Sequence, residues 1–298
     1  MYIYKSRTLD MLLSSIYTVR EVYKKQRVEG CPYDGIAFCS TALPKTSFLA
    51  LADRFKRPNK KPSSYYQHVL LSNLFHVYWI PVTCNNKWTT MVRINPNKQQ
   101  LTPQGVLDLL AYVFEDLSQV YVASFDEKVD LENMTVDEVV KGLKIPHSRS
   151  MQDYADTTYY SGKRGGQQTK VYDKAKEAGI ENKVITRIEK TKKMDSSKRP
   201  TLIEFFSYSS SQAIAKLKLI DVDKIDKRTT IGKHISKYDT LKEAELHMSP
   251  SVKEKYRKQS KLYPTLIDLE SEFAAQLKKW KKTSFKNHRE LKRKIAHL

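Results

Sequence analysis

Carboxylates at alternate positions of one predicted strand are the first residues of this chain that could do chemistry. Residues 120–131 have the pattern of a buried strand, on which Asp126 and Asp130 share one face. Glu189 lies on a second predicted strand, 183–191. If the two strands are neighbours, three carboxylates converge and suit a hard divalent cation such as Mg²⁺ or Mn²⁺. Without that neighbour, the aspartates are solvated or salt-bridged side chains.

Positive charge is the second chemical feature of the sequence. The 298 residues hold 53 Lys and Arg against 33 Asp and Glu, a formal net charge of +20. Two segments, 141–200 and 237–298, each have a net charge of +8. One such segment alone is usually a solvated surface, but two segments with interleaved tyrosines favour nucleic acid over an acidic membrane surface.

Several classes of protein are disfavoured by what the sequence lacks. No run approaches 18 apolar residues and the first residues lack a signal-peptide core, so we expect a soluble, cytoplasmic protein. The three cysteines, Cys31, Cys39 and Cys84, have no CxxC spacing, which disfavours a disulfide framework or a structural zinc site. The chain also contains no P-loop motif.

The elements that must position these residues follow from local patterns. Thr102 and Pro103 suit an N-cap and a first helical residue, and the apolar residues after them recur at helical spacing. We expect helices at 9–25, after 102 and beyond 202, strands at 34–40, 88–94, 120–131 and 183–191, an apolar run at 69–82, a hairpin of 157–160 with 170–173, and a linker at 192–200. This order predicts an α/β or α+β fold.

Four short motifs occur in a distinctive order. They are NPNK at 95–98, GKR at 162–164, VYDK at 171–174 and RIE at 187–189, with the Asp126–Asp130 pair between the first two. Together they closely resemble the rolling-circle replication initiators of plasmids and phages, a family that includes some conjugative relaxases. The resemblance spans about residues 34–193.

This resemblance implies an α+β fold with a central antiparallel sheet of the HUH-endonuclease type, packed by helices. It implies a catalytic domain at 1–195 and a mostly helical, basic DNA-binding and dimerisation region at 196–298. Tyr172 matches the nucleophile of the family, with Tyr160 in reserve, and Lys174 would share its strand face and stabilise phosphate charge. Asp126, Asp130 and Glu189 match the residues that form or support a Mg²⁺ or Mn²⁺ site.

The chain also departs from the family pattern. Ser124, Glu127 and Lys128 stand where the family has an arginine and apolar residues, and there is no His-apolar-His pair. His76 is the nearest substitute, and it is either a ligand or a core residue. Lys170 replaces a common arginine, which keeps the charge but loses bidentate phosphate geometry.

The implied reaction is attack by the Tyr172 hydroxyl on one strand of an origin, which gives a 5′-phosphotyrosyl intermediate and a free 3′-hydroxyl primer, followed by rejoining. The expected partners are origin DNA, a second copy of the chain, and a host helicase and polymerase, with no membrane. The expected DNA-binding residues are Lys163, Arg164, Lys170, Lys253, Lys255, Arg257, Lys258 and Lys261. A conjugative relaxase and a DNA-binding protein that never cuts remain the alternatives.

Overall fold

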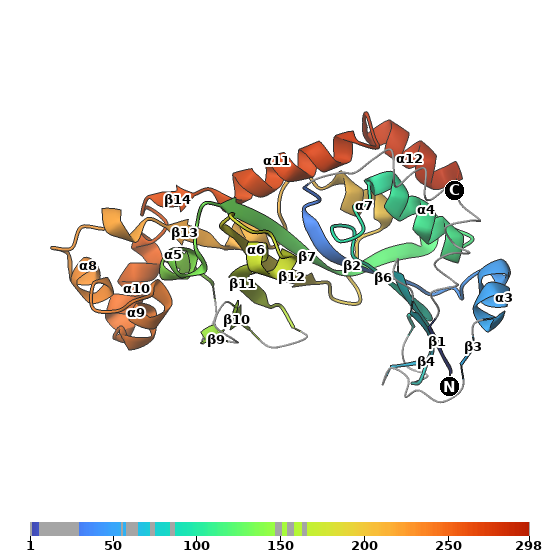
Figure 1. Cartoon of the computed structure of the whole chain (residues 1–298), viewed down its shortest axis with the longest axis horizontal. Helices are drawn as coiled ribbons and strands as arrows, with labels where there is room; N and C mark the ends of the chain where they lie inside the picture. The colour runs from blue at the N-terminus through green and yellow to red at the C-terminus, as the bar shows by residue number, and fades with distance from the viewer. Residues whose placement is uncertain are drawn as a thin grey trace. The chain divides into compact units, whose positions relative to one another are not determined.

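The chain folds into two units in this computed structural model (Figure 1). The structure describes residues 2–5, 30–54, 56–57, 65–71, 75–83, 87–146, 151–153, 158–162 and 166–297. Unit 1 comprises 1–126, 193–209 and 276–298, and unit 2 comprises 127–192 and 210–275. The predicted helix at 9–25 lies outside the described residues, as do Cys84, Lys163 and Arg164.

Unit 1 is built on a mostly antiparallel sheet. Its strands are β1 (Tyr2–Lys5), β2 (Tyr33–Ser40), β3 (Lys56–Arg57), β4 (Tyr66–Leu71), β5 (Phe75–Pro81), β6 (Thr90–Ile94) and the first half of β7 (Val120–Glu132). They lie in the order β3-β1-β4-β5-β6-β2-β7. The pair β1 and β4 is parallel, whereas β1 and β3, β4 and β5, β5 and β6, and β2 and β6 are antiparallel. The predicted strands at 34–40 and 88–94 are therefore confirmed as β2 and β6.

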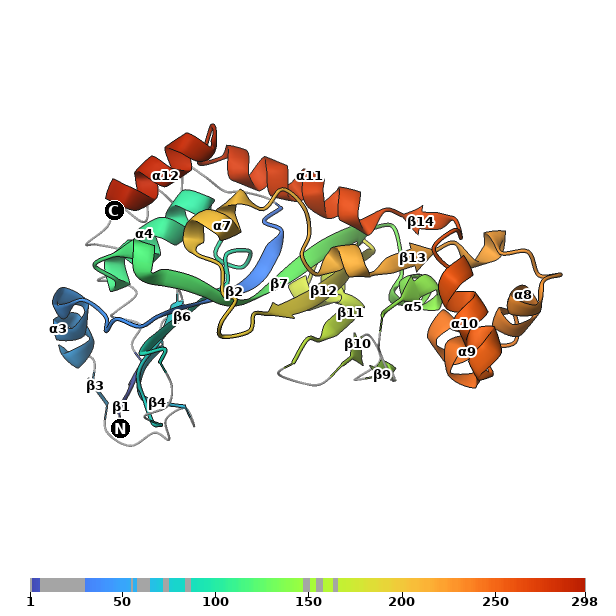
Figure 2. The same ribbon diagram turned by 180° about the vertical axis from the view of Figure 1, so that it is seen from behind.

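Helices cover this sheet because each has an apolar side. They are α3 (Thr46–Arg54), α4 (Pro103–Val113), the single turn η1 (Leu117–Gln119), α7 (Leu202–Ser207), the end of α11 (Leu269–Lys282) and α12 (His288–His297). Thr102 caps α4 by accepting a 3.0 Å hydrogen bond from the Gly105 N–H, as the sequence predicts. In both views α4, α7 and α12 lie on one side of β2 and β6 (Figure 2).

Aromatic rings form the centre of unit 1. The Tyr33 ring of β2 lies 5.7 Å from Phe125, 5.2 Å from Phe205 and 5.5 Å from Trp280, measured between centroids. The Trp280 indole N–H donates a 2.8 Å hydrogen bond to the Leu101 carbonyl, so its one polar atom is satisfied in the core.

Unit 2 continues β7 into a second group of antiparallel strands. They are β12 (Ile185–Lys193), β11 (Thr169–Asp173), β10 (Thr158–Ser161) and β9 (Met151–Asp153), in the order β7-β12-β11-β10-β9. The strands β10 and β11 pair as the predicted hairpin. After β11 the chain turns into α6 (Lys174–Ala178), which ends at Gly179 in the left-handed conformation that glycine favours.

Unit 2 also contains a small helical module with its own core. Three strands, β8 (Leu143–Lys144), β13 (Lys218–Ile220) and β14 (Thr265–Ile267), pack with α5 (Val136–Gly142), α8 (Thr230–Ile235), α9 (Leu241–His247), α10 (Pro250–Gln259) and the turns η2 (Ile214–Lys216) and η3 (Val222–Lys224). Buried Ile231, Leu241 and Tyr256 belong to that core. Gly142 is required, because a Cβ there would lie 2.3 Å from the Ile220 carbonyl oxygen.

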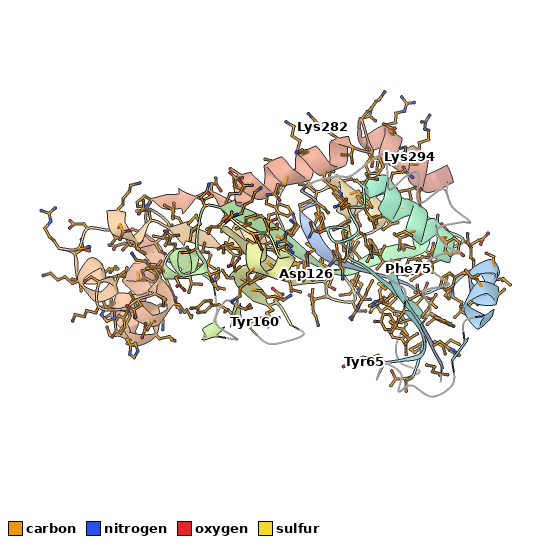
Figure 3. The ribbon with its side chains drawn as sticks, in the orientation of Figure 1. Tyr65, Phe75, Asp126, Tyr160, Lys282 and Lys294 are labelled. Carbon is orange, nitrogen blue, oxygen red and sulfur yellow. The ribbon has the colours of Figure 1, made fainter. Side chains whose placement is uncertain are left out.

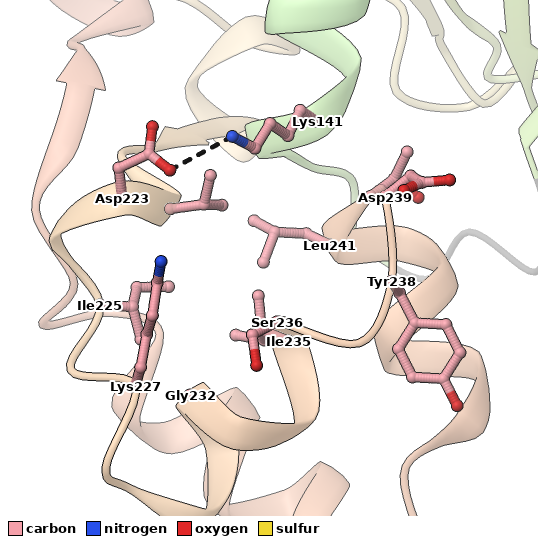
Figure 4. A pocket seen from close by; sticks show the side chains of 12 residues that line it. Lys141, Asp223, Ile225, Lys227, Gly232, Ile235, Ser236, Tyr238, Asp239 and Leu241 are labelled. Atoms are coloured by element: carbon pink, nitrogen blue, oxygen red, sulfur yellow. Dashed lines mark hydrogen bonds and ion pairs between the residues drawn. The ribbon is translucent and has the colours of Figure 1, made fainter.

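A pocket of about 180 Å³ opens between α5, α8 and α9 (Figure 4). At its rim, Lys141 of α5 and Asp223 form a 3.2 Å ion pair, and Tyr238 and Asp239 come from the turn between α8 and α9. Both groups of the ion pair are largely exposed, so its contribution to stability is small. The pocket lining includes two lysines and two aspartates, so it has no excess of positive charge.

These observations confirm the predicted α+β class, with a large and mostly antiparallel sheet packed by helices and with helices at the C-terminal end. The predicted division at 195 and 196 into two functional domains stays a prediction. None of the described helices is long and apolar enough to span a membrane.

Candidate active site

A row of polar side chains lies on one face of the strands in unit 2. Lys170 and Tyr172 of β11 are paired in register with Glu189 and Arg187 of β12. Residues directly opposite in antiparallel strands point to the same face, so these four side chains are neighbours. The intervening Val171 points the other way and is fully buried. Each strand therefore has a polar face, which carries these four side chains, and a packing face, which is buried in the core.

The Tyr172 hydroxyl donates a 2.5 Å hydrogen bond to Oε1 of Glu189. The Lys170 ammonium donates a 3.1 Å hydrogen bond to Oε2 of the same carboxylate. Glu189 is only 3% exposed, and Tyr172 is half-buried. A carboxylate within hydrogen-bond distance of a hydroxyl is positioned to take its proton, and a nearby ammonium favours the charged forms of both groups.

Asp130 lies in a second, bidentate ion pair. Its carboxylate accepts hydrogen bonds from Arg187 at 2.5 Å and 2.8 Å and from the Lys128 ammonium at 2.8 Å. Burial acts to raise the pKa of Asp130, but the hydrogen bonds from Arg187 and the charge of Lys128 outweigh it, and the pKa lies below its ordinary value. Asp130 is therefore ionised at neutral pH, and it fixes the direction of the Arg187 guanidinium.

The carboxylates of Asp130 and Glu189 already have side-chain hydrogen-bond donors in this arrangement. Both oxygens of Asp130 accept from Arg187 or Lys128, and both oxygens of Glu189 accept from Tyr172 or Lys170. Over the described part of the chain, no three His, Cys, Asp or Glu side chains form a group that could hold a metal. The Mg²⁺ or Mn²⁺ site expected from the sequence stays a prediction.

The structure places the remaining predicted site residues in different positions. Asp126 belongs to unit 1, where its Oδ2 lies 3.0 Å from the place a Cβ on Gly35 would take (Figure 3). Tyr160 of β10 pairs in register with Lys170, so it shares the polar face of unit 2. His76 of β5 is exposed and lies opposite Arg93, and its pKa is lowered by partial burial and by that guanidinium.

The structure corrects the expected position of Lys174. The prediction that it shares a strand face with Tyr172 is wrong, because β11 ends at Asp173 and Lys174 is the first residue of α6. The Asp173 side chain caps this helix by accepting a 2.9 Å hydrogen bond from the Lys176 N–H. The Lys174 ammonium forms an ion pair with Glu177. Its catalytic role stays a prediction.

The predicted DNA-binding lysines and arginine near the C-terminus cluster on and just after α10. Tyr256 is fully buried and anchors this helix to the module, while Lys255, Arg257 and Lys258 are exposed. Lys258 forms a 2.9 Å ion pair with Glu254 within the helix. Lys253 is half-buried, and Lys261 is exposed beyond the helix end.

An open pocket of about 540 Å³ lies beside the end of α10 and gathers further positive charge. Four lysines line it, together with Asp268 and Glu270: Lys144, Lys216, Lys218 and Lys261. The Lys218 ammonium donates to three backbone carbonyls, those of residues 260, 261 and 263, and so holds the chain after α10 in place. Burial and neighbouring cations lower the pKa of Lys144. Such a cluster suits a phosphate group.

Lys128 and Arg187 were not among the expected site residues. The strand period places Arg187 on the same face as Glu189, and Lys128 on the same face as Asp130. It does not predict that Lys128 and Arg187 both bind Asp130. Glu127, which the sequence shows only as a departure from the family pattern, is a fully buried carboxylate on the packing face.

No family model and no curated protein matches this chain. A solved structure of a rolling circle replication initiator protein from Geobacillus stearothermophilus is 14% identical, with a TM-score of 0.37, over 55% of this chain and 74% of that chain.

Proposed function

We propose that this protein is a DNA strand transferase that nicks and rejoins one strand of a replication origin and so initiates rolling-circle replication. The observation that carries the proposal is the hydrogen bond from the Tyr172 hydroxyl to Glu189, with Lys170 bound to the same carboxylate. The order of motifs at 95–98, 162–164, 171–174 and 187–189 supports it, because it resembles the order in such initiators.

The chemistry follows from these contacts. A tyrosine hydroxyl has an ordinary pKa of about 10, so it needs a base and a positive field to attack at neutral pH. Glu189 takes the proton of Tyr172 as the phenol oxygen forms a bond to the phosphorus, and the bond from phosphorus to the 3′-oxygen breaks. Water supplies the proton that completes the 3′-hydroxyl, and the 5′-phosphate stays on the tyrosine.

Cationic side chains near the nucleophile stabilise the negative charge that develops on the phosphate. Lys170 lies two residues before Tyr172 on the same strand face, and Arg187 lies directly opposite Tyr172 on β12. Asp130 keeps the guanidinium oriented. Because one phosphodiester replaces another of similar energy, the 3′-hydroxyl can reverse the step without ATP.

The proposal retains the expectations that the sequence raised. We also propose that the reaction depends on Mg²⁺ or Mn²⁺ and that the protein acts as a homodimer. It would work with a host helicase and polymerase in the cytoplasm. The cations of α10 would hold origin DNA through its phosphates, with sequence read by base or shape contacts. A relaxase for conjugative transfer would use the same active-site residues.

The proposal is tested with single-stranded DNA fragments tiled across the replicon of the protein, incubated with Mg²⁺ or Mn²⁺ and resolved on denaturing gels. We expect one fragment to be cut and cutting to be lost in Tyr172→Phe. Tyr160→Phe is the matched control, because Tyr160 shares the face but lies on β10. Cutting that survives in Tyr172→Phe would contradict the assignment.

The exposed cations of α10 favour a second candidate, a DNA-binding protein that does not cut. This candidate predicts tight binding of the origin with no cleavage of any fragment, with either metal or with neither. The same gels therefore distinguish the two functions, and a further lane with a chelator in place of the metal tests the metal dependence separately.

A further inference from the structure

The last segment of unit 1 carries an unusual excess of positive charge. Residues 276–298 contain nine Lys and Arg and a single acidic residue, Glu290. Seven of these cations are exposed, and we call them the C-terminal cationic face: Lys278, Lys279, Lys282, Lys286, Arg289, Lys292 and Arg293. Lys282, labelled in Figure 3, points away from the body of the protein.

The two helices that carry this face are fixed to the core of unit 1. Every Leu, Ile, Phe and Trp side chain between 277 and 295 is buried. The Trp280 N–H bonds the Leu101 carbonyl, and the Phe285 ring lies 5.9 Å from Phe206. The cationic face is therefore a fixed array on α11 and α12, with the spacing of a helix surface.

Two further cations of the segment turn inward and do not belong to the face. The Lys281 ammonium donates to the Tyr208 carbonyl, and burial lowers its pKa to about 8. Lys294 lies 3.7 Å from Glu290 and donates to the Ser284 carbonyl. The Glu290 carboxylate also accepts a 2.8 Å hydrogen bond from the backbone N–H of Lys286.

Glu290 is the one acidic residue in this segment, and the Lys286 N–H together with the charges of Lys294, Lys286 and Arg293 lowers its pKa. Among the residues that the structure describes, none of the seven exposed cations takes part in an ion pair. Ordinary solvated helix faces intersperse both signs of charge, because like charges three or four residues apart repel. A fixed array of one sign is complementary to a regular polyanion.

The residue types of the cationic face favour one kind of polyanion over single-stranded nucleic acid and over a lipid surface. No aromatic Phe, Tyr or Trp ring of this segment is exposed among the described side chains, so unpaired bases have nothing to stack on. The large apolar side chains from 277 to 295 are buried, so none can enter a lipid surface. We propose that the C-terminal cationic face binds the phosphate backbone of duplex DNA without reading its sequence.

This inference extends the proposed function, since it supplies a duplex contact in addition to the nick site, but it does not depend on cleavage. It is tested in full-length Tyr172→Phe protein, which cannot nick under the proposed mechanism. The binding of a random-sequence duplex is measured by fluorescence anisotropy at several salt concentrations, and the slope of log K against log salt concentration gives the number of phosphates contacted.

The test variant is Lys282→Gln with Lys286→Gln and Lys292→Gln. The slope is negative, and each lost phosphate contact reduces its magnitude by about 0.9. We therefore expect the magnitude to decrease by about 3 in the triple variant. The matched control removes three exposed lysines elsewhere in unit 1, Lys98, Lys193 and Lys198, and we expect it to leave the slope within about 1 of the parent.

Several results would overturn the inference. One is an unchanged slope in the test variant, and another is an equal decrease in the control, which would indicate only the overall charge. A third is a test variant that loses binding to phosphatidylserine vesicles but binds the duplex as the parent protein does. A Lys→Arg triple variant at the same positions must restore the slope, so a folding defect cannot produce the expected result.

Discussion

Glu189 is the residue whose chemistry can be tested most sharply, because it contacts the proposed nucleophile. We predict that Glu189→Gln lowers the nicking rate at pH 7 about 100-fold, the typical loss on removal of a general base. Without that base the tyrosine must ionise by itself, so the rate of the variant rises with pH more steeply than that of the unaltered enzyme. Single-turnover cleavage rates from pH 6 to pH 10 measure both effects.

Glu181→Gln is the control for Glu189, because Glu181 is exposed on the turn that follows α6. Its cleavage rate and pH profile should match those of the unaltered protein. A Glu189→Gln variant with a normal rate and a normal profile would contradict the role of this carboxylate as a base.

Asp130 gives a prediction about stability. Its folded-state pKa is below the ordinary value, so its ionised form stabilises the fold at neutral pH, and this contribution is lost as the pH falls through the folded-state pKa. We predict that Asp130→Asn lowers the free energy of unfolding by about 3 kcal/mol at pH 7, because it leaves Arg187 and Lys128 without their carboxylate. Urea denaturation at pH 7 and at pH 3 should show the difference shrinking in acid.

Asp223→Asn is the control for that experiment. Asp223 also forms an ion pair, with Lys141, but both side chains are largely exposed, so the expected loss is below about 1 kcal/mol. A constant difference between Asp130→Asn and the unaltered protein from pH 7 to pH 3 would show that the ionised carboxylate does not contribute as proposed.

The faces of individual residues could be predicted from the strand period, whereas their partners could not. Alternation places Tyr172 with Lys170 and Glu189 with Arg187. It does not say that Arg187 of β12 meets Asp130 of β7, because that contact depends on which strands are neighbours and on their register. The sequence therefore left Asp130 open between a metal site and an ion pair, and the structure shows the ion pair.

At the scale of elements, polar N-cap side chains determine where helices begin. Thr102 starts α4 as predicted, since its hydroxyl satisfies a free backbone N–H. Asp173 does the same for α6, and a cap at this position ends the strand one residue before Lys174. The sequence predicts a strand that ends at 173, and it was the resemblance to the initiators that placed Lys174 on the strand face of Tyr172.

Glu127 carries a prediction about an element, the segment of residues 211–216 that packs against β7. Its carboxylate is fully buried and accepts hydrogen bonds from the Ser211 hydroxyl and from three successive backbone N–H groups, those of residues 212, 213 and 214. We predict that Glu127→Gln lowers the free energy of unfolding by about 3 kcal/mol, because the amide group cannot accept from all four donors. Urea denaturation at pH 7 measures this loss.

Glu132→Gln, at the exposed end of the same strand, should change the free energy of unfolding by less than about 0.5 kcal/mol. If Glu127→Gln is no less stable than Glu132→Gln, then Glu127 does not hold the segment in place.

At the scale of the whole molecule, the path of the chain was the least predictable feature. Residues 193–209 and 276–298 return to unit 1, while 210–275 belong to unit 2. The sequence indicates the composition of the linker at 192–200 but not these returns, because they are fixed by contacts distant in sequence, such as Trp280 with Tyr33. Local patterns predict an α/β or α+β fold, since that requires only the types and order of the elements, and the resemblance to the initiators implied the α+β class.

The net charge of +20 divides over the molecule in a way that suits more than one contact with DNA. Unit 2 carries exposed cations on α10 and lysines in the pocket beside it, and unit 1 carries the C-terminal cationic face. In the proposed function, the polar face around Tyr172 performs the reaction and these surfaces hold the strands.

The central claim is that Tyr172 becomes covalently attached to DNA, and peptide mapping tests it most directly. The protein is incubated with the cleaved origin fragment, digested with nuclease and protease, and analysed by mass spectrometry. The account predicts a nucleotide attached through a 5′-phosphate to the peptide that contains Tyr172, and none on Tyr160. An attachment to any other residue, or cleavage without an attachment, would contradict the account.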